Sequence, residues 1–309
     1  MSRILVTGGA GFIGSNLAKY LLQDGNSVRI LDNFSTGKRE NLNGIMDRIE
    51  LIEGDIRSYH TVMKSLSDID YVFHEAALPS VPRSIYDPIT SNDVNIVGTL
   101  NLLQCSKDMG VKKFIFASSS SVYGDNMELP KRETMKPLPK SPYALTKLTG
   151  EHYCSIFYKI YGMPTISLRY FNVFGPNQDP TSQYSAFIPK IFKALKEKGK
   201  ITVFGDGEQT RDFTYIENVV NANILSLSSN EDSYGEYFNV ATGKSISVNE
   251  IIKYVFEASK MKADVEYAPP RTGDVRDSLA DISKISSNLK YFVSVHARDG
   301  LKKAMAYYL

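Results

Sequence analysis

The feature that most constrains the fold is a set of three glycines near the start of the chain. Gly8, Gly11 and Gly14 lie where an apolar segment, residues 3–7, gives way to a helical pattern over 12–24. In a strand–turn–helix unit, this spacing permits a tight turn, a close approach of backbone to a pyrophosphate, and close packing of helix on strand. The helix N-terminus also offers free N–H groups to phosphates. The motif therefore predicts a dinucleotide site, with a glycine-rich turn that binds nothing as the alternative.

Short β-rich segments alternate with helical patterns through the first half of the chain. Further strands are predicted at 27–32, 49–53, 71–75, 113–118 and 165–170, and helices at 95–109 and 142–161. Strands separated by helices pair in parallel, and the helices cover both faces of the sheet. We therefore predict an α/β fold with a Rossmann-type, doubly wound parallel sheet.

The pattern changes after about residue 170. Gly, Pro, Asn and Asp cluster over 172–184, after which helices (188–198, 212–228, 247–259) are mixed with strands (237–240, 263–267). We expect residues 1–170 to form the dinucleotide-binding domain. Residues 171–309 are then mainly a smaller, mixed α/β substrate domain, with some segments returning to the Rossmann sheet.

Acidic residues at two strand ends indicate which dinucleotide binds. Asp32 ends the second predicted strand, where a carboxylate binds the ribose hydroxyls of adenosine and repels the extra phosphate of NADP. This favours NAD, although Lys38 and Arg39 nearby keep NADP as an alternative. Asp55 follows the third strand and either accepts from the adenine amino group or serves as a turn or N-cap residue.

Other residues of the predicted cofactor site follow from their positions beside these motifs. His74 is interpreted as a strand-end histidine with satisfied hydrogen bonds, and the small Ala76 after it lets backbone approach the cofactor. The remaining predicted cofactor-binding residues are Phe12, Ile13, Asn33, Ile56 and Lys147.

A second set of residues predicts acid–base chemistry. Ser141 and Pro142 are a good N-cap and first-turn pair, so Tyr143 and Lys147 lie one turn apart on one helix. A lysine ammonium there is expected to lower the pKa of the tyrosine, which could then exchange a proton with a substrate hydroxyl. The serine run 118–121 ends the fifth strand and can hydrogen-bond the same oxygen. The alternatives are a surface Tyr–Lys pair and a polar loop.

Composition excludes several other classes of protein. The chain has 36 basic and 34 acidic residues, which argues against nucleic-acid binding through bulk charge. Its two cysteines have no zinc-type spacing, so no metal is expected. A long apolar span and a signal-peptide pattern are both missing, so we expect no membrane partner and a cytoplasmic enzyme.

The glycine motif, the serine run and Tyr143-x-x-x-Lys147 together resemble the extended short-chain dehydrogenase/reductase family. Within it the chain resembles NAD-dependent nucleotide-sugar 4-epimerases, and most of all those acting on UDP-N-acetylglucosamine and UDP-glucose. The matching segments are 74–77 (HEAA), 80–84 (SVPRS), 169–175 (RYFNVFG), 205–207 (GDG), 211–213 (RDF) and 273–276 (GDVR).

The resemblance implies tightly held NAD and a set of site residues. Tyr143 matches the acid/base, Ser119 the serine that assists it, and Lys147 their partner. The resemblance also implies a set of residues that bind the nucleotide sugar. Asn172, Arg211 and Arg271 match residues that contact the diphosphate, and Asp274 matches an acid near the nucleotide ribose. Ser278 matches a position at which a large residue narrows the sugar pocket in hexose-specific relatives.

The expected reaction is reversible C4 epimerisation of UDP-GlcNAc and UDP-GalNAc, and also of UDP-glucose and UDP-galactose, through a transient 4-keto sugar. The alternatives are a UDP-uronate 4-epimerase or another 4-keto-forming enzyme, and a non-catalytic protein that binds NAD and a nucleotide sugar. Related dehydratases carry an acid within the serine run, which this chain lacks.

The resemblance also suggests a homodimer through the helices around Leu100 and Cys154. Two departures are Asn218, where relatives often have Asp, and a tail from Tyr291 that matches poorly.

Overall fold

The computed structural model describes residues 1–180, 187–270 and 276–309. Within these residues the largest sheet has seven parallel strands in the order β11-β6-β5-β4-β1-β2-β3. The strand order reverses between β1 and β4, the point at which open α/β sheets bind ligands beyond the carboxyl ends of their strands. The predicted doubly wound Rossmann sheet is thereby confirmed.

The strands of this sheet are β1 Arg3–Thr7, β2 Ser27–Asp32, β3 Ile49–Glu53, β4 Tyr71–His74, β5 Lys113–Ser119, β6 Thr165–Tyr170 and β11 Glu236–Val240. Of these, β11 comes from beyond residue 170 and pairs with β6.

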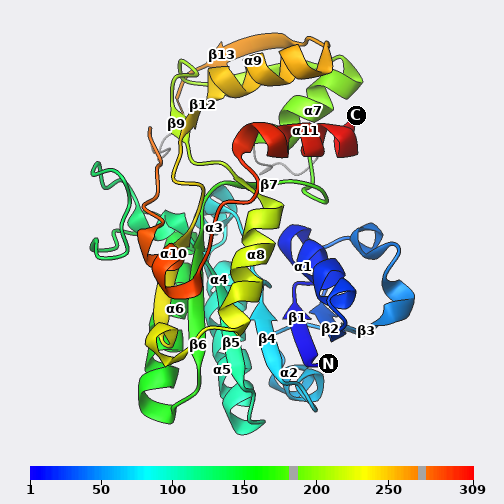
Figure 1. Cartoon of the computed structure of the whole chain (residues 1–309), viewed down its shortest axis with the longest axis vertical. Helices are drawn as coiled ribbons and strands as arrows, with labels where there is room; N and C mark the ends of the chain where they lie inside the picture. The colour runs from blue at the N-terminus through cyan, green and yellow to red at the C-terminus, as the bar shows by residue number, and fades with distance from the viewer. Residues whose placement is uncertain (181–186, 271–275) are drawn as a thin grey trace.

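Alternating side chains of the strands divide the core into two layers. On β1, Ile4 and Val6 face helices α1 and α8, whereas Leu5 faces α2, α5 and α6 on the other side of the sheet. In Figure 1, α1 and α8 lie in front of the sheet. The helices around the sheet are α1 Phe12–Gln23, α2 Tyr59–Ser65, α3 Val81–Tyr86, α4 Pro88–Asn92, α5 Gly98–Asp108, α6 Pro142–Tyr161, α8 Ile216–Leu227 and α10 Ser283–Leu289.

A smaller part of the molecule lies beyond the carboxyl ends of the strands and holds the C-terminus (Figure 1). It contains a parallel pair of strands, β8 and β13, packed with three helices. Its apolar core is continuous with the layer between the sheet and α1 and α8. The elements of this part are α7 Phe187–Glu197, β8 Lys200–Phe204, α9 Val248–Ser259, β13 Asp264–Ala268 and α11 Ala297–Tyr308.

Short strand pairs join the two parts, and one of them corrects a predicted element. The pairs are β7 Val173–Phe174 with β10 Thr214–Tyr215, and β9 Thr210–Arg211 with β12 Ile246–Ser247. The helix expected over 212–228 therefore begins only at Ile216. The preceding residues are extended because they pair with β7 and because Thr214 N donates to Asn172 O.

Candidate active site

The glycine turn is built so tightly that side chains would disrupt it. Gly8 has a φ of +68°, and a Cβ atom on it would lie 2.7 Å from the backbone of Ala76. A Cβ on Gly14 would lie 2.3 Å from the carbonyl oxygen of Gly8. Gly11 is the N-cap of α1, and no described side chain caps this helix. Its first N–H groups are therefore available to phosphate, which fits a dinucleotide pyrophosphate.

Asp32 lies beside this turn and already orders it. Its two carboxylate oxygens accept hydrogen bonds from Ala10 N (2.9 Å) and Phe34 N (2.8 Å). Burial raises the pKa of Asp32, while these two backbone hydrogen bonds act against the rise. Each carboxylate oxygen has a second acceptor position, so a ribose hydroxyl can still bind.

The strand ends next to Asp32 bring Asn33 and Asp55 together. Asn33 Nδ2 donates to Asp55 Oδ2 at 2.9 Å, and Arg57 donates to both oxygens of Asp55. The hydrogen bond from Arg57 lowers the pKa of Asp55 to about 2. These contacts give Asp55 a role in its own turn, and its binding of adenine stays a prediction.

The other predicted cofactor residues line the same turn and strand ends. Phe12 and Ile13 begin α1, Ala76 lies against Gly8, and Ile56 is buried beside Gly98. The cations that could have favoured NADP are both engaged within the chain. Lys38 pairs with Asp179 at 3.0 Å, and Arg39 pairs with Glu53.

His74 is a buried structural residue, in agreement with its interpretation from sequence. Its Nδ1 and Nε2 lie 2.8 Å from the hydroxyls of Thr7 and Thr99. Because Thr99 donates its own proton to Asn95 O, it accepts from Nε2, and Thr7 then donates to Nδ1. Burial lowers the pKa of His74 to about 3, so the ring stays neutral.

Ser119, Tyr143 and Lys147 meet at the carboxyl end of β5. Ser141 caps α6 by accepting from Ala144 N, which places Tyr143 and Lys147 on the helix as predicted. Lys147 is 4% exposed, and its Nζ donates to Ala117 O at 2.7 Å, two residues before Ser119.

The predicted lowering of the Tyr143 pKa by Lys147 is wrong. Burial raises the pKa of Tyr143 to about 12, and interaction with Ser119 only partly opposes the rise. The reason is geometric, because the ammonium faces the Ala117 carbonyl and lies 6.0 Å from the centroid of the tyrosine ring. Burial also lowers the pKa of Lys147 to about 8.

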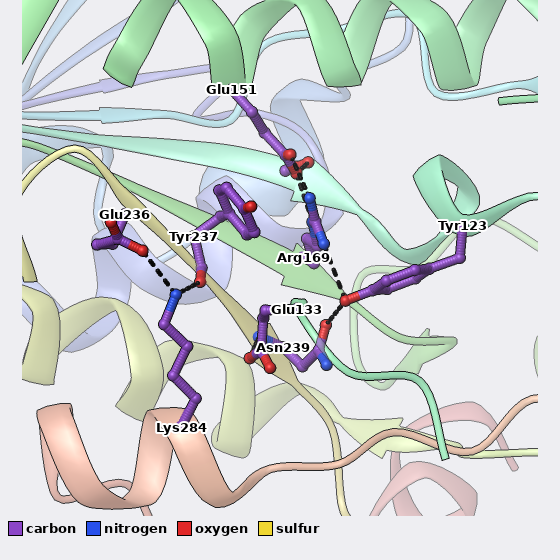
Figure 2. A network of polar contacts seen from close by, with 9 residues as sticks. Tyr123, Glu133, Glu151, Arg169, Glu236, Tyr237, Asn239 and Lys284 are labelled. Carbon is purple, nitrogen blue, oxygen red and sulfur yellow. Dashed lines mark hydrogen bonds and ion pairs between the residues drawn. The ribbon is translucent and has the colours of Figure 1, made fainter. Parts of the chain in front are cut away.

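A buried ion pair behind the site was not anticipated from the sequence. Figure 2 shows Arg169 of β6 between Glu151 of α6 and Tyr123. Arg169 donates to both oxygens of Glu151 (2.8 and 2.7 Å) and to Tyr123 Oη (2.9 Å). Ser118 also donates to Glu151. Since Glu151 lies one turn after Lys147, this network fixes α6, and hence Lys147, against β5 and β6.

The network continues from Tyr123 toward the residues after 276. Tyr123 Oη donates to Asn239 Oδ1 at 2.6 Å (Figure 2). Asn239 Nδ2 donates to Lys131 O and Asp281 O. Glu133 accepts from Asn239 N. The loop after β5 and the segment that follows residue 276 are thereby tied to the same sheet edge.

The predicted substrate residues lie in the segments that join the two parts of the molecule. Arg211 ends β9 and donates to Arg276 O at 2.7 Å, while Ser278 N donates to Thr210 O at 3.1 Å. Asn172 Nδ2 donates to Asp212 O at 3.3 Å. Asn172, Arg211 and Ser278 are therefore gathered together. Arg271 and Asp274 lie outside the described residues.

Asp212 organises these segments and was also missed in the sequence. Its buried carboxylate accepts from Thr242 N and Oγ1, Gly243 N and Ala280 N. It therefore holds the loop after β11 and the segment containing Ser278 in place. The sequence offered only its position next to Arg211 as a signal.

Asn218, the departure from relatives, is explained by the tail. Its Oδ1 accepts from Ser294 N and Val295 N, and its Nδ2 donates to Val295 O at 2.6 Å. An amide can both donate and accept here, whereas a carboxylate can only accept. The tail then continues as α11, which packs on α7 and α9.

No described helix is long and apolar enough to cross a membrane. Among the same residues, no group of His, Cys, Asp and Glu could hold a metal ion.

Comparisons with known proteins agree with the fold and the site. The model of the NAD dependent epimerase/dehydratase family matches residues 4–241. A putative UDP-glucose 4-epimerase of Methanocaldococcus jannaschii is 37% identical over 98% of this chain and 97% of its own. A UDP-N-acetylglucosamine 4-epimerase of Methanobrevibacter ruminantium is 41% identical, with a TM-score of 0.94 over 99% of this chain and 98% of that one. A UDP-glucuronic acid 4-epimerase of Bacillus cereus, solved with UDP-glucuronic acid and NAD, is 36% identical, with a TM-score of 0.90 and the same coverage.

The sheet, the glycine turn and the tyrosine–lysine pair define a dinucleotide-dependent enzyme of the short-chain dehydrogenase/reductase type. The chain belongs to the NAD dependent epimerase/dehydratase family. Within that family it is of the nucleotide-sugar 4-epimerase class, which confirms the predicted class and the NAD cofactor.

Proposed function

We propose that this enzyme interconverts the C4 epimers of UDP-GlcNAc and UDP-GalNAc, and also those of UDP-glucose and UDP-galactose. The observation that carries this proposal is the meeting of Ser119, Tyr143 and Lys147 at the carboxyl end of β5, beside the glycine turn. A cytoplasmic location stays a prediction.

In the proposed reaction, Tyr143 Oη takes the proton of the sugar 4-hydroxyl and later returns it. The Ser119 hydroxyl hydrogen-bonds the same sugar oxygen and orients it. The Lys147 ammonium lies 6.0 Å from the centroid of the Tyr143 ring, and its proposed role is to hold the nicotinamide ribose of the cofactor. NAD held by the glycine turn and Asp32 would supply the hydride acceptor and donor for C4. Arg211 and Asn172 hold the diphosphate while the 4-keto sugar turns over, so that C4 is reduced from its other face.

The test is to incubate the purified protein separately with UDP-glucose, UDP-GlcNAc and UDP-glucuronate and to determine the C4 configuration by NMR. Epimers of the first two are expected. Conversion of the uronate alone would instead favour the UDP-uronate 4-epimerase. If no sugar is converted while NAD is bound, a non-catalytic protein that binds NAD and a nucleotide sugar is favoured instead. Tyr143→Phe should lower turnover by about 10²–10⁴-fold with binding retained, and near-normal turnover would exclude its role.

The breadth of substrates rests on the small side chain of Ser278. The backbone N–H of Ser278 donates to Thr210 O of β9, the residue before Arg211. A small residue leaves volume for an N-acetyl group. Ser278→Tyr should therefore suppress the N-acetylated substrate selectively, while the matched control Ser278→Ala should not. An equal loss for both substrates in the tyrosine variant would contradict the pocket assignment.

We also propose that the enzyme is a homodimer through α5 and α6. Cys154 itself is buried, but α6 carries exposed apolar side chains at Leu145, Ile156 and Ile160, whose spacings of eleven and four residues put them on one face of the helix. A second copy is the proposed cover of this face. Light scattering should give twice the chain mass for the wild type and a monomer for Ile160→Glu, whereas a monomeric wild type would contradict the proposal.

A further inference from the structure

The first turn of α6 contains one backbone N–H group that the helix cannot satisfy by itself. The first N–H groups of any helix have no partner within it, and Pro142, which begins α6, has no N–H at all. The N-cap Ser141 serves two others, because its hydroxyl accepts from Ala144 N at 3.1 Å and its carbonyl accepts from Leu145 N at 3.0 Å. The N–H that is left over belongs to Tyr143, the residue that exchanges the proton in the proposed reaction.

A buried serine of another helix accepts this N–H. Ser84 of α3 is fully buried, and its Oγ lies 3.0 Å from Tyr143 N. The same hydroxyl donates its proton to Val81 O at 2.8 Å, one turn back in α3. Since a hydroxyl has one proton and two acceptor positions, it can make both hydrogen bonds at once. The Ser84 hydroxyl therefore links α3 directly to the backbone of Tyr143.

The backbone carbonyl of Tyr143 is held as well. Thr146 Oγ1 donates to Tyr143 O at 2.8 Å and accepts from Asn95 Nδ2 at 3.1 Å. Asn95 Oδ1 in turn accepts from Leu78 N at 2.8 Å. Leu78 and Ser84 both belong to the stretch of chain that follows β4. This stretch therefore holds the N–H of Tyr143 directly and its carbonyl through two side chains.

The same stretch of chain touches the cofactor turn at its other end. Ala76 lies so close to Gly8 that a Cβ on the glycine would be 2.7 Å from its backbone. Ser80 caps α3 by accepting from Arg83 N at 3.1 Å, which fixes where the helix begins and hence where Ser84 lies. The position of Tyr143 relative to the glycine turn is thus set through residues 76–84.

We propose that Ser84 is a positioning residue, whose buried hydroxyl holds the backbone of Tyr143 and so aligns the tyrosine Oη with the sugar 4-hydroxyl. This inference rests on the proposed function, because it names a residue that acts through Tyr143. Ser84→Ala would leave the Tyr143 N–H without its acceptor, and the first turn of α6 would then be free to shift. Since transfer of the proton and hydride depends on close alignment, the loss should fall on turnover rather than on substrate binding.

A matched control lies in the next helix along the chain. Ser91 of α4 is also buried, and its hydroxyl donates to Asp87 O at 2.8 Å, a bond of the same kind as that from Ser84 to Val81. Helix α4 packs on α6, as α3 does. Within the described part of the chain the Ser91 hydroxyl makes no other hydrogen bond. Ser91→Ala therefore removes a buried local bond and leaves the backbone of Tyr143 held.

Steady-state kinetics of epimerisation separate positioning from a general loss of structure. Ser84→Ala should lower kcat by about 10–10²-fold with KM nearly unchanged, whereas Ser91→Ala should keep the wild-type kcat. With substrate deuterated at C4, the isotope effect on kcat in Ser84→Ala should be at least as large as in the wild type, because the slowed step is the transfer itself. An equal fall of kcat in both variants, an unchanged kcat in Ser84→Ala, or a smaller isotope effect overturns the proposal.

A second readout does not depend on turnover. In protein labelled with ¹⁵N at tyrosine, the amide signal of Tyr143 is assigned by its loss in Tyr143→Phe. Exchange of this amide with D₂O should be slow in the wild type and in Ser91→Ala, and clearly faster in Ser84→Ala. Equal exchange in all three proteins overturns the inference. If the wild type epimerises no sugar, the proposed function fails, and the exchange measurement still decides whether Ser84 holds the Tyr143 N–H.

Discussion

The Glu151–Arg169 pair permits a sharp test of what holds the catalytic helix in place. The two side chains are 2% and 1% exposed. Replacing Glu151 by Leu would leave the Arg169 guanidinium buried without a carboxylate, with the Tyr123 hydroxyl as an acceptor and the Tyr237 ring 4.0 Å away, and Ser118 would lose its acceptor. Removing one member of a buried pair costs about 3–5 kcal/mol, against a total stability of about 5–15 kcal/mol.

Equilibrium urea unfolding measures this cost. Glu151→Leu should reduce the free energy of unfolding by about 3–5 kcal/mol. The double variant Glu151→Leu/Arg169→Met should lose less than the single one, because no unpaired charge remains buried. Lys303→Met, which breaks an ion pair with Glu217 whose side chains are half exposed, is the control and should cost about 0.2–1 kcal/mol. The reasoning is refuted if Glu151→Leu behaves like this control, or if the double variant is the least stable.

Three further results are expected. Gly14→Ala should abolish NAD binding measured by calorimetry, because the new Cβ would lie 2.3 Å from the carbonyl oxygen of Gly8. The matched control Gly199→Ala should bind NAD normally, because its Cβ would have its nearest neighbour at 3.8 Å. Lys113→Met should lower the free energy of unfolding, measured in urea, by about 1.5–3 kcal/mol. The Lys113 ammonium donates hydrogen bonds to three carbonyl oxygens at and just beyond the end of α8, and these would lose their donor. An unchanged free energy of unfolding would contradict this role. Burial raises the pKa of Glu75 from 4.5 to about 7, so between these pH values the folded state binds a proton that the unfolded state does not. The free energy of unfolding of the wild type, relative to that of Glu75→Gln, should therefore fall as pH rises from 5 to 7. A difference that does not change with pH would contradict the raised pKa.

The parts of the fold and site that the sequence predicted depend on short-range patterns. The glycine spacing, the strand runs and the Ser141 cap are local, so the positions of Tyr143 and Lys147 on one helix face followed directly. The start of α8 was predicted at residue 212 instead of Ile216, because Thr214 pairs with β7 and is therefore extended rather than helical.

The missed residues act through contacts between distant segments. Arg169 meets Glu151 only after β6 packs beneath α6, and Asp212 binds backbone N–H groups of two separate segments. The pKa of Tyr143 was predicted in the wrong direction because spacing shows the lysine but not the burial of the phenol. Glu75 was read only as part of a strand end, since nothing local shows that Tyr170 reaches it.

The central claim is that hydride leaves C4 and returns to the same carbon within one site. The most direct test follows UDP-glucose and UDP-GlcNAc carrying deuterium at C4, by NMR of the epimerised product. The product should keep deuterium at C4, and unlabelled substrate should gain none there in D₂O. Loss of the label to water, or uptake of solvent deuterium at C4, would contradict a retained 4-keto sugar and the acid–base role given to Tyr143.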